Sequence, residues 1–464
     1  MAAQTKSVHP KRKGAVLIVS MIFVLIFSAL AVSMAGLSGT NIQIADNQCN
    51  LDRARAAAES GFEVIRYWLS KVSISGTTSE SQRLTQIANS FQSELTAAGI
   101  TNLSTTFDGT SLTIPSVPLD SANGCSFSAT IYALDVDTLQ IDVTGAHGSL
   151  TRTIRSHYCF TERAHTVFDF GVASKGPLSL SGNIELEGIN VSVEASVYIE
   201  SENSNLALSI TGNSQIAGDV SIVNPIANVD LQGGQAGIGG ETGQDAIDNH
   251  VSFGVPPSEF PEPVPSQYLS YITNVVDANT DTSADATFEN VKILAGVNPS
   301  FSGHVTLKGL VYIETPNAVT FTGTTDVIAI IVGDGIWTDS SGTNQINFLG
   351  NVCSLPVSNL PYEEQFEGLH DETGTFVMAP GFRTSFGGSF DTLSGAIASN
   401  GIEFFGNAGG TINGSVINYS DDQMTLSGNS DLFFNRSGIT EAPAGFVPEI
   451  VLDYDPDTYS EVIL

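Results

Sequence analysis

An uninterrupted apolar run near the N-terminus limits what this chain can fold into. Residues 15–37 carry no charged side chain, and Lys11, Arg12 and Lys13 stand directly before them. At about 1.5 Å per helical residue the run reaches roughly 34 Å, enough to cross a bilayer core of about 30 Å. Because basic flanks stay in the cytoplasm, the sequence predicts a single-pass protein whose C-terminal part lies outside the cytoplasm.

The residues after this run predict that the helix continues. No proline occurs between 40 and 71, and apolar side chains recur there at three- and four-residue spacing. These positions are Leu51, Ala54, Ala58, Phe62, Ile65 and Leu69. The pattern is typical of an amphipathic helix, so one transmembrane and assembly helix is expected over 15–72. A signal peptide cut before Gly36 and a plain anchor with a helical stalk remain as alternatives.

Two motifs in this helix resemble a known family. A basic residue followed by Gly-Ala-Val-Leu-Ile-Val occupies 13–19, and Arg-Ala-Ala-Ala-Glu-Ser-Gly-Phe occupies 55–62. Together they resemble the N-terminal domain of PilX-type minor pilins of type IV pili, and they are similar to the large minor pseudopilin at the tip of type II secretion filaments. The resemblance implies a leader over 1–14, cut by a prepilin peptidase between Gly14 and Ala15, and a methylated new N-terminus.

The same resemblance implies partners and a location. The partners are other pilin or pseudopilin subunits, and the chain resides in the bacterial inner membrane before it enters a cell-surface filament. Major pilins carry a glutamate four residues after the new N-terminus, where this chain has Val19. The missing carboxylate favours a tip or initiating subunit over a repeated shaft subunit. The second motif places Glu59, Ser60 and Gly61 on the assembly helix.

Charge is distributed unevenly along the chain. The first 14 residues hold four of the 17 Lys and Arg residues and no acid, which leaves 13 basic against 49 acidic residues, a net charge of −36. Such a surface does not bind a nucleic acid backbone, which requires basic patches. It fits solubility outside the cell or the binding of divalent cations.

Residues 73–165 predict a small α+β head of the pilin type. An amphipathic helix is expected over 79–98, followed by alternating apolar and polar runs over 106–163 that predict an antiparallel sheet. Cys125 begins one such run and Cys159 ends another. Because adjacent strands and an oxidising compartment allow a bridge, a Cys125–Cys159 disulfide is expected.

A short glycine phrase recurs from residue 166 onward. It consists of an apolar or aromatic residue, usually one further residue, then Gly and often Asn, and four of the six gaps between successive glycines are 20 to 30 residues long. This spacing predicts a parallel β-solenoid over 166–441, with a β-sandwich as the alternative. The fold class is therefore α+β followed by mostly β.

Two segments interrupt this repeat. Five prolines between 256 and 265 predict an excursion from the solenoid near 245–276, the alternative being a linker between two domains. The last segment, 442–464, is expected to be a tail or a cap on the last coil.

One loop carries oxygen side chains at calcium-loop spacing. They are Asp277, Asn279, Asp281, Ser283 and Asp285. Calcium takes six to eight oxygen ligands, so these residues are a candidate Ca²⁺ site, and no other cofactor is expected. Thr282 stands where a glycine is usual and Phe288 where a glutamate is expected, so a solvated polar loop is the alternative.

The sequence favours a protein without catalytic activity. No Gly-x-Ser-x-Gly elbow and no pair of histidines at metal-ligand spacing occurs. The function expected is that of a minor pilin or pseudopilin which displays a β-solenoid for assembly initiation or for adhesion to a surface or carbohydrate ligand. The alternative is a membrane-anchored or secreted β-solenoid enzyme acting on polysaccharide, with His370, Asp371 and Glu372 as its most site-like cluster.

Overall fold

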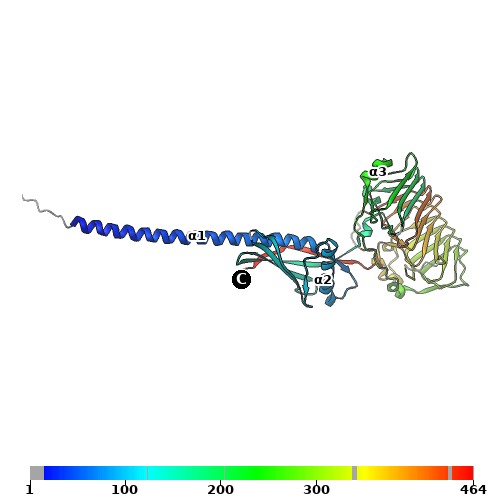
Figure 1. The fold of residues 1–464 in the computed structure, drawn as a ribbon. Helices are drawn as coiled ribbons and strands as arrows, with labels where there is room; N and C mark the ends of the chain where they lie inside the picture. The colour runs from blue at the N-terminus through cyan, green and yellow to red at the C-terminus, as the bar shows by residue number, and fades with distance from the viewer. Residues whose placement is uncertain (1–14, 123, 203, 337–341, 437–441, 463–464) are drawn as a thin grey trace, which may run out of the picture. The chain divides into compact units, whose positions relative to one another are not determined.

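The protein has a long N-terminal apolar helix followed by a mostly β body with parallel sheets (Figure 1). The computed structural model describes residues 15–122, 124–202, 204–336, 342–436 and 442–462. The chain divides into two compact units, which we describe separately. The first comprises the residues up to Ile74, Thr78–Thr161 and the segment from Val451, and the second comprises Ser75–Thr77 and Glu162–Ile450.

Helix α1 spans Ala15–Leu69, 55 residues without a break. At about 1.5 Å per residue it is roughly 82 Å long. Its second half is amphipathic, as expected: Ala54, Ala58, Phe62, Ile65 and Leu69 are all buried. The helix ends three residues before the expected boundary at 72.

The first unit packs helices against an antiparallel sheet. Helix α2 (Glu80–Ala97) buries Leu84, Ile87, Phe91 and Leu95 at helical spacing. The sheet order is β1-β35-β6-β5-β4-β3-β2. Its strands are β1 (Ser73–Ser75), β2 (Thr106–Phe107), β3 (Ser111–Asp120), β4 (Cys125–Ala133), β5 (Thr138–His147), β6 (Leu150–Arg163) and β35 (Glu449–Val462). Alternate residues of β4 and β5 are apolar and buried, which gives the sheet one apolar face.

The C-terminal segment does not cap the repeat region. Its 14-residue strand β35 lies between β1 and β6 in the sheet of the first unit. The hydroxyl oxygen of Thr458 accepts a hydrogen bond from the backbone N–H of His157 at 2.8 Å. Of the two expectations for 442–464, the cap on the last coil is therefore wrong, because β35 belongs to a sheet whose other strands precede it by at least 286 residues in the chain.

The strands of the second unit form three sheets with parallel pairing, except for one antiparallel pair, β15–β16. The 12-stranded sheet contains β7 (Val172–Ser174), β10 (Val197–Ile199), β13 (Val220–Ile222), β17 (Val251–Phe253), β18 (Asn274–Val276), β19 (Ala286–Ile293), β21 (Val305–Ile313), β23 (Thr325–Gly333), β25 (Val352–Ser354), β26 (Thr375–Ala379), β29 (Ala396–Ser399) and β32 (Val416–Asn418). The nine-stranded sheet contains β8 (Leu178–Gly182), β11 (Leu206–Gly212), β14 (Asn228–Gln232), β20 (Ser300–Phe301), β22 (Ala318–Phe321), β24 (Gln345–Phe348), β27 (Arg383–Phe386), β30 (Ile402–Phe404) and β33 (Met424–Gly428). The seven-stranded sheet contains β9 (Glu185–Gly188), β12 (Gln215–Ile216), β15 (Gly237–Ile238), β16 (Glu241–Thr242), β28 (Thr392–Leu393), β31 (Gly410–Ile412) and β34 (Leu432–Phe434). This parallel pairing does not fit the β-sandwich alternative, which requires antiparallel sheets.

Strands β7 to β17 and β26 to β34 enter the three sheets in rotation, whereas β18 to β25 belong only to the 12-stranded and nine-stranded sheets. We call each such passage of the chain a coil. Residues in register on coils that follow one another in the chain are 17 to 46 positions apart, as in Asn274–Val291 and Ile331–Val377. The last coil pairs with the first, since Val416 lies opposite Val172. The array therefore begins in its middle: β7 to β17 extend one way, and β18 to β32 return from the other end.

A column of stacked phenylalanine rings runs through the core of these coils. Its members occupy the same register position on successive strands and are Phe301, Phe321, Phe348, Phe386 and Phe404. Neighbouring rings are 4.9 to 5.1 Å apart at 9 to 11°. All five are buried in the apolar cluster to which the three sheets contribute. Parallel pairing repeats one residue position at each step, so the rings stack.

Two structural features require glycine at the recurring positions. Gly212 adopts a φ of +81°, a conformation that side chains rarely take. Gly323 instead approaches the preceding coil, and an added β-carbon would overlap the carbonyl oxygen of Gly303. Only some of the recurring glycines therefore adopt a left-handed conformation.

The proline-rich segment crosses the second unit from β17 to β18, the two ends of the 12-stranded sheet. It is preceded by helix α3 (Gly243–His250) and contains the 3-10 helix Pro265–Tyr271. The carbonyl oxygen of Pro261 accepts a hydrogen bond from the Tyr419 hydroxyl at 2.6 Å. This segment belongs to the second unit throughout and is not a linker between the two units. Shorter 3-10 helices cover Thr166–Asp169, Ser192–Ala195, Val357–Asn359, Glu364–Phe366 and Leu369–Asp371.

Candidate functional site

The first half of α1 carries an apolar surface that nothing in the described part of the chain covers. Every residue from 16 to 49 is exposed, and large apolar side chains occur from Val16 to Ile44. Among the described residues this is the one helix long and apolar enough to cross a membrane. Exposing so much apolar surface to water is unfavourable, at about 25 cal/mol per Å², so lipid or apolar protein is its stable environment.

The second half of α1 packs closely on the sheet. An added β-carbon at Gly145 of β5 would overlap the backbone of Ala54 and Ala58. Gly61 of the helix likewise leaves room for the ring of Phe127 on β4. Small residues on both surfaces thus bring the helix backbone against the strand, and a larger side chain at either place forces them apart.

The other motif residues of the helix lie at its surface. Glu59 accepts a hydrogen bond from Arg55 Nε at 3.0 Å, and Ser60 is exposed. Val19 is half-exposed within the uncovered apolar stretch. Of the predicted assembly residues, only Gly61 therefore has a packing role inside this chain. Contacts of Val19, Glu59 and Ser60 with another subunit stay a prediction.

The C-terminal strand β35 packs against α1, and this contact was not predicted from the sequence. Glu461 of β35 forms ion pairs with Arg152 at 3.3 Å and with Arg55 of α1 at 3.9 Å. The ring of Phe62 meets the rings of Tyr454 and Tyr459, with centroids 5.5 and 6.0 Å away. The available signal was the apolar and aromatic content of 449–462, which does not say with which sheet the strand pairs.

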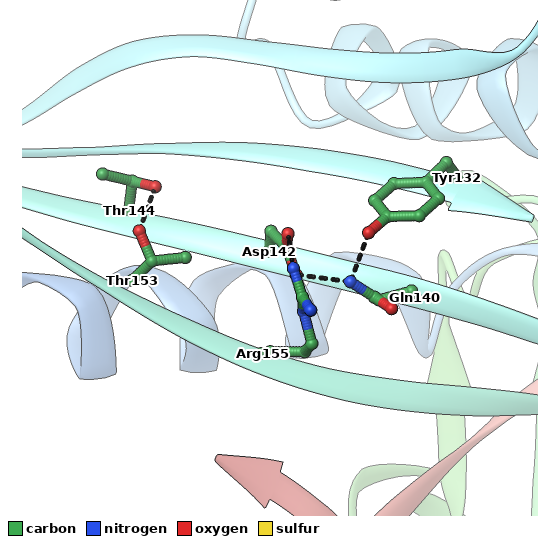
Figure 2. Close-up of polar contacts among 6 residues, drawn as sticks. All are labelled: Tyr132, Gln140, Asp142, Thr144, Thr153 and Arg155. Atoms are coloured by element: carbon green, nitrogen blue, oxygen red, sulfur yellow. Dashed lines mark hydrogen bonds and ion pairs between the residues drawn. The ribbon is translucent and has the colours of Figure 1, made fainter. Parts of the chain in front are cut away.

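One face of the first unit's sheet carries a polar network (Figure 2). Asp142 accepts two hydrogen bonds from Arg155, at 2.8 and 2.7 Å, and a third from Gln140 at 3.0 Å. Gln140 also contacts the Tyr132 hydroxyl. A shallow hollow of about 330 Å³ lies over this face. Arg155 engages both oxygens of Asp142, and this network contains no second carboxyl group for acid–base chemistry.

The predicted disulfide is wrong. Cys125 lies opposite His147 and Cys159 lies opposite Thr138, so the two cysteines are at opposite ends of β5. Those ends are separated by about 30 Å at roughly 3.4 Å per residue. A disulfide needs Cα atoms within about 7 Å, and both cysteines are free. The strand-like runs do share one sheet, but a full-length strand lies between the cysteines.

The carboxylates of the candidate calcium loop accept hydrogen bonds from backbone and side-chain groups of this chain. Asp277 accepts from the N–H of Asn279 at 2.9 Å, and this bond lowers the pKa of the Asp277 carboxyl. Asp281 accepts from Ser283, and Asp285 accepts from the N–H of His304 at 2.7 Å. Within the described residues no group of three acidic, histidine or cysteine side chains could hold a metal ion. Calcium binding by this loop, including Asn279 and Ser283 as ligands, stays a prediction.

His370 serves the local structure of its loop. Its Nδ1 lies 3.1 Å from the carbonyl oxygen of Phe366 and its Nε2 lies 3.0 Å from that of Leu360. The ring stacks on Tyr362 at 4.8 Å. Glu372 accepts a hydrogen bond from the Tyr268 hydroxyl at 3.3 Å. Both ring nitrogens of His370 are thus engaged, which leaves neither directed at a substrate.

The predicted cleavage point cannot be placed. Gly14 lies outside the described residues, and α1 begins with Ala15. Processing between these two residues therefore stays a prediction.

Comparison with known proteins adds little to these observations. No protein-family model matches the chain, and no curated protein matches it. Among solved structures, the competence-associated pilin ComZ from Thermus thermophilus aligns with 89% of this chain and 98% of its own length, at 11% sequence identity and a TM-score of 0.23. A TM-score this low carries no argument about fold or function. The function proposed below therefore depends on the residues of this chain alone.

Proposed function

We propose that this chain is a minor, PilX-type pilin or pseudopilin subunit of a type IV pilus or a related filament. Helix α1 would anchor it in the bacterial inner membrane before assembly, with the C-terminus outside the cytoplasm. After a prepilin peptidase has cut before Ala15, the same helix would pack among those of neighbouring subunits.

The observation that carries this proposal is the continuity of α1. One unbroken helix joins an uncovered apolar half to a half that is packed on the chain's own sheet. A signal peptide is removed from the mature protein, so it does not need this continuity. A helix that must leave the bilayer and enter a filament needs an apolar half free of intramolecular contacts and a second half that carries the folded head.

The absence of a carboxylate at Val19 supports a tip or initiating role. Val19 lies among exposed apolar side chains, so it offers no charge to the terminal amine of a neighbouring subunit. Repeated addition along a shaft would lose that ion pair at each step. A subunit that occurs once, at the start or tip of the filament, does not need it.

We further infer that the second unit is a parallel β-solenoid displayed by the filament. Supporting observations are the parallel pairing of successive coils, the rotation of β7 to β17 and of β26 to β34 through three sheets, and the stacked phenylalanine column. Parallel coils with a shared core are stabilised mainly by their nearest neighbours. The outer surface is strongly acidic, which suits a role in adhesion or assembly outside the cell.

Cleavage-site variants test the proposal in a host that makes type IV filaments. The wild-type chain and Gly36→Leu, the matched control at the alternative signal-peptidase site, are expected to mature and to appear in sheared filaments with other pilin subunits. Gly14→Leu is expected to stay at full length in the inner membrane. The opposite result, with Gly36→Leu blocking maturation and Gly14→Leu processed normally, would refute the proposal.

A further inference from the structure

Three side chains from three elements meet at one end of the first unit's sheet. Cys125 is the first residue of β4 and lies directly opposite His147, the last residue of β5. Cys125 Sγ is 3.3 Å from His147 Nδ1. His147 Nε2 is 3.4 Å from Nη1 of Arg53 on α1. A thiol, an imidazole and a guanidinium thus form one connected series of contacts.

The guanidinium determines where the imidazole proton lies. Arginine has only N–H donors, so His147 Nε2 accepts from Arg53 and carries no proton in the neutral ring. The ring proton is then on Nδ1, the nitrogen that faces Cys125 Sγ. His147 therefore donates an N–H to the sulfur, and the Arg53 charge strengthens this donor. Both effects stabilise negative charge as it develops on the sulfur.

We propose that Cys125 is a thiol–disulfide exchange site that takes low-molecular-weight disulfides. It is the least exposed of the four cysteines, since Cys49, Cys159 and Cys353 are all classed as exposed and Cys125 is half-buried. Solvent accessibility alone would therefore predict that Cys125 is the least reactive of the four thiols. Its contacts with His147 and Arg53 instead predict that it is the most reactive.

The other thiols lack a comparable setting. Burial and the negative charges of Asp326 and Asp391 raise the pKa of the Cys353 thiol, which opposes formation of its thiolate. Cys159 lies at the opposite end of the sheet from Cys125, and its strand partner is Thr138, not a histidine. Cys159 is therefore a suitable internal reference for reactivity.

The reaction is a balanced exchange. The Cys125 thiol loses its proton to solvent, and the sulfur attacks one sulfur of the disulfide RS–SR. The Cys125–S bond to that sulfur forms as the RS–SR bond breaks, and the released RS⁻ takes a proton from solvent. The net change is Cys125–SH + RSSR → Cys125–S–SR + RSH. The proposal does not depend on the proposed pilin function.

The test uses the full chain in detergent micelles with oxidised glutathione as the probe. Peptide mass mapping over time gives the rate of mixed-disulfide formation at each cysteine. Cys125 is expected to react at least about fivefold faster than Cys159, the scale expected for a charge-assisted hydrogen bond at a partly exposed site. His147→Gln and Arg53→Gln are each expected to remove most of this advantage.

Two controls separate reactivity from folding. The Cys159 rate is expected to stay unchanged within about twofold in every variant, because that residue is at the far end of β5. Arg53→Lys, which keeps a charged donor toward Nε2, is expected to retain more of the Cys125 rate than Arg53→Gln. Equal rates at Cys125 and Cys159 in the wild-type chain would overturn the proposal, and so would a Cys125 rate that neither Gln variant changes.

Discussion

Replacing Phe348 with leucine tests whether stacking, beyond burial, holds the coils together. The Phe348 ring is fully buried, with centroids 5.1 Å from Phe321 and 5.0 Å from Phe386. An aromatic pair contributes about 0.5–1.5 kcal/mol beyond its buried area, so losing the two stacked pairs costs about 1–3 kcal/mol. The tilted contact of Phe348 with Phe376, with centroids 6.0 Å apart, is lost as well. The smaller volume of leucine adds about 1 kcal/mol. The expected loss in free energy of unfolding is therefore about 2–4 kcal/mol.

The assay is guanidinium unfolding of the full chain in detergent, followed by far-UV circular dichroism. The matched control is Phe382→Leu, because Phe382 is fully buried but stacks on no other ring in the described part of the chain. It is expected to lose only about 1 kcal/mol. A double-mutant cycle of Phe348→Leu with Phe321→Leu is expected to give a coupling energy of about 0.5–1.5 kcal/mol. Equal losses at Phe348 and Phe382, with no measurable coupling, would refute the reasoning.

Three further predictions follow from the packing and charge of the two units. Gly145→Val is expected to destabilise the first unit by about 2 kcal/mol in thermal unfolding, because the added side chain overlaps the backbone of α1. The control Gly36→Val has open space around it and should change stability by less than about 0.5 kcal/mol. Equal effects of the two substitutions would count against close helix–sheet packing. Deleting residues 449–464 removes β35 and is expected to make the first unit far more sensitive to proteolysis than the full chain, so unchanged sensitivity would contradict its role in the sheet. Burial raises the pKa of Glu200 from 4.5 to about 7, so the contribution of this residue to stability is fully present below about pH 4.5 and is lost as the pH rises through 7. Glu200→Gln should flatten this part of the pH–stability profile, and an identical profile in the variant would show that Glu200 does not contribute.

Local periodicity was enough to predict the packed face of α1. The contacts that bury Phe62 and Leu69 follow from helical spacing, which is visible in a window of about 18 residues. The recurring aromatic residue and glycine similarly predicted parallel coils, because a repeat of 20 to 30 residues is a property of the sequence itself. In the coil near 404 the residue directly before the glycine is Phe405, which is half-buried, whereas its neighbour Phe404 occupies the column.

Long-range pairing was beyond what the sequence could predict. Strand β35 joins a sheet whose other strands lie at least 286 residues earlier, and nothing local in 449–462 specifies that partner. The error at Cys125 and Cys159 has the same origin: the sequence indicated two strands of one sheet but not the strand between them. The contact of His147 with Arg53 also depends on packing, because 94 residues separate them.

The mass of the mature N-terminal peptide tests the central claim most directly. The account holds that α1 is retained whole as an anchoring and assembly helix, so the chain purified from its natural host should begin at a methylated Ala15. A chain that begins at Gly36 would mean that the apolar half of α1 is removed as a signal peptide. That result would contradict the account.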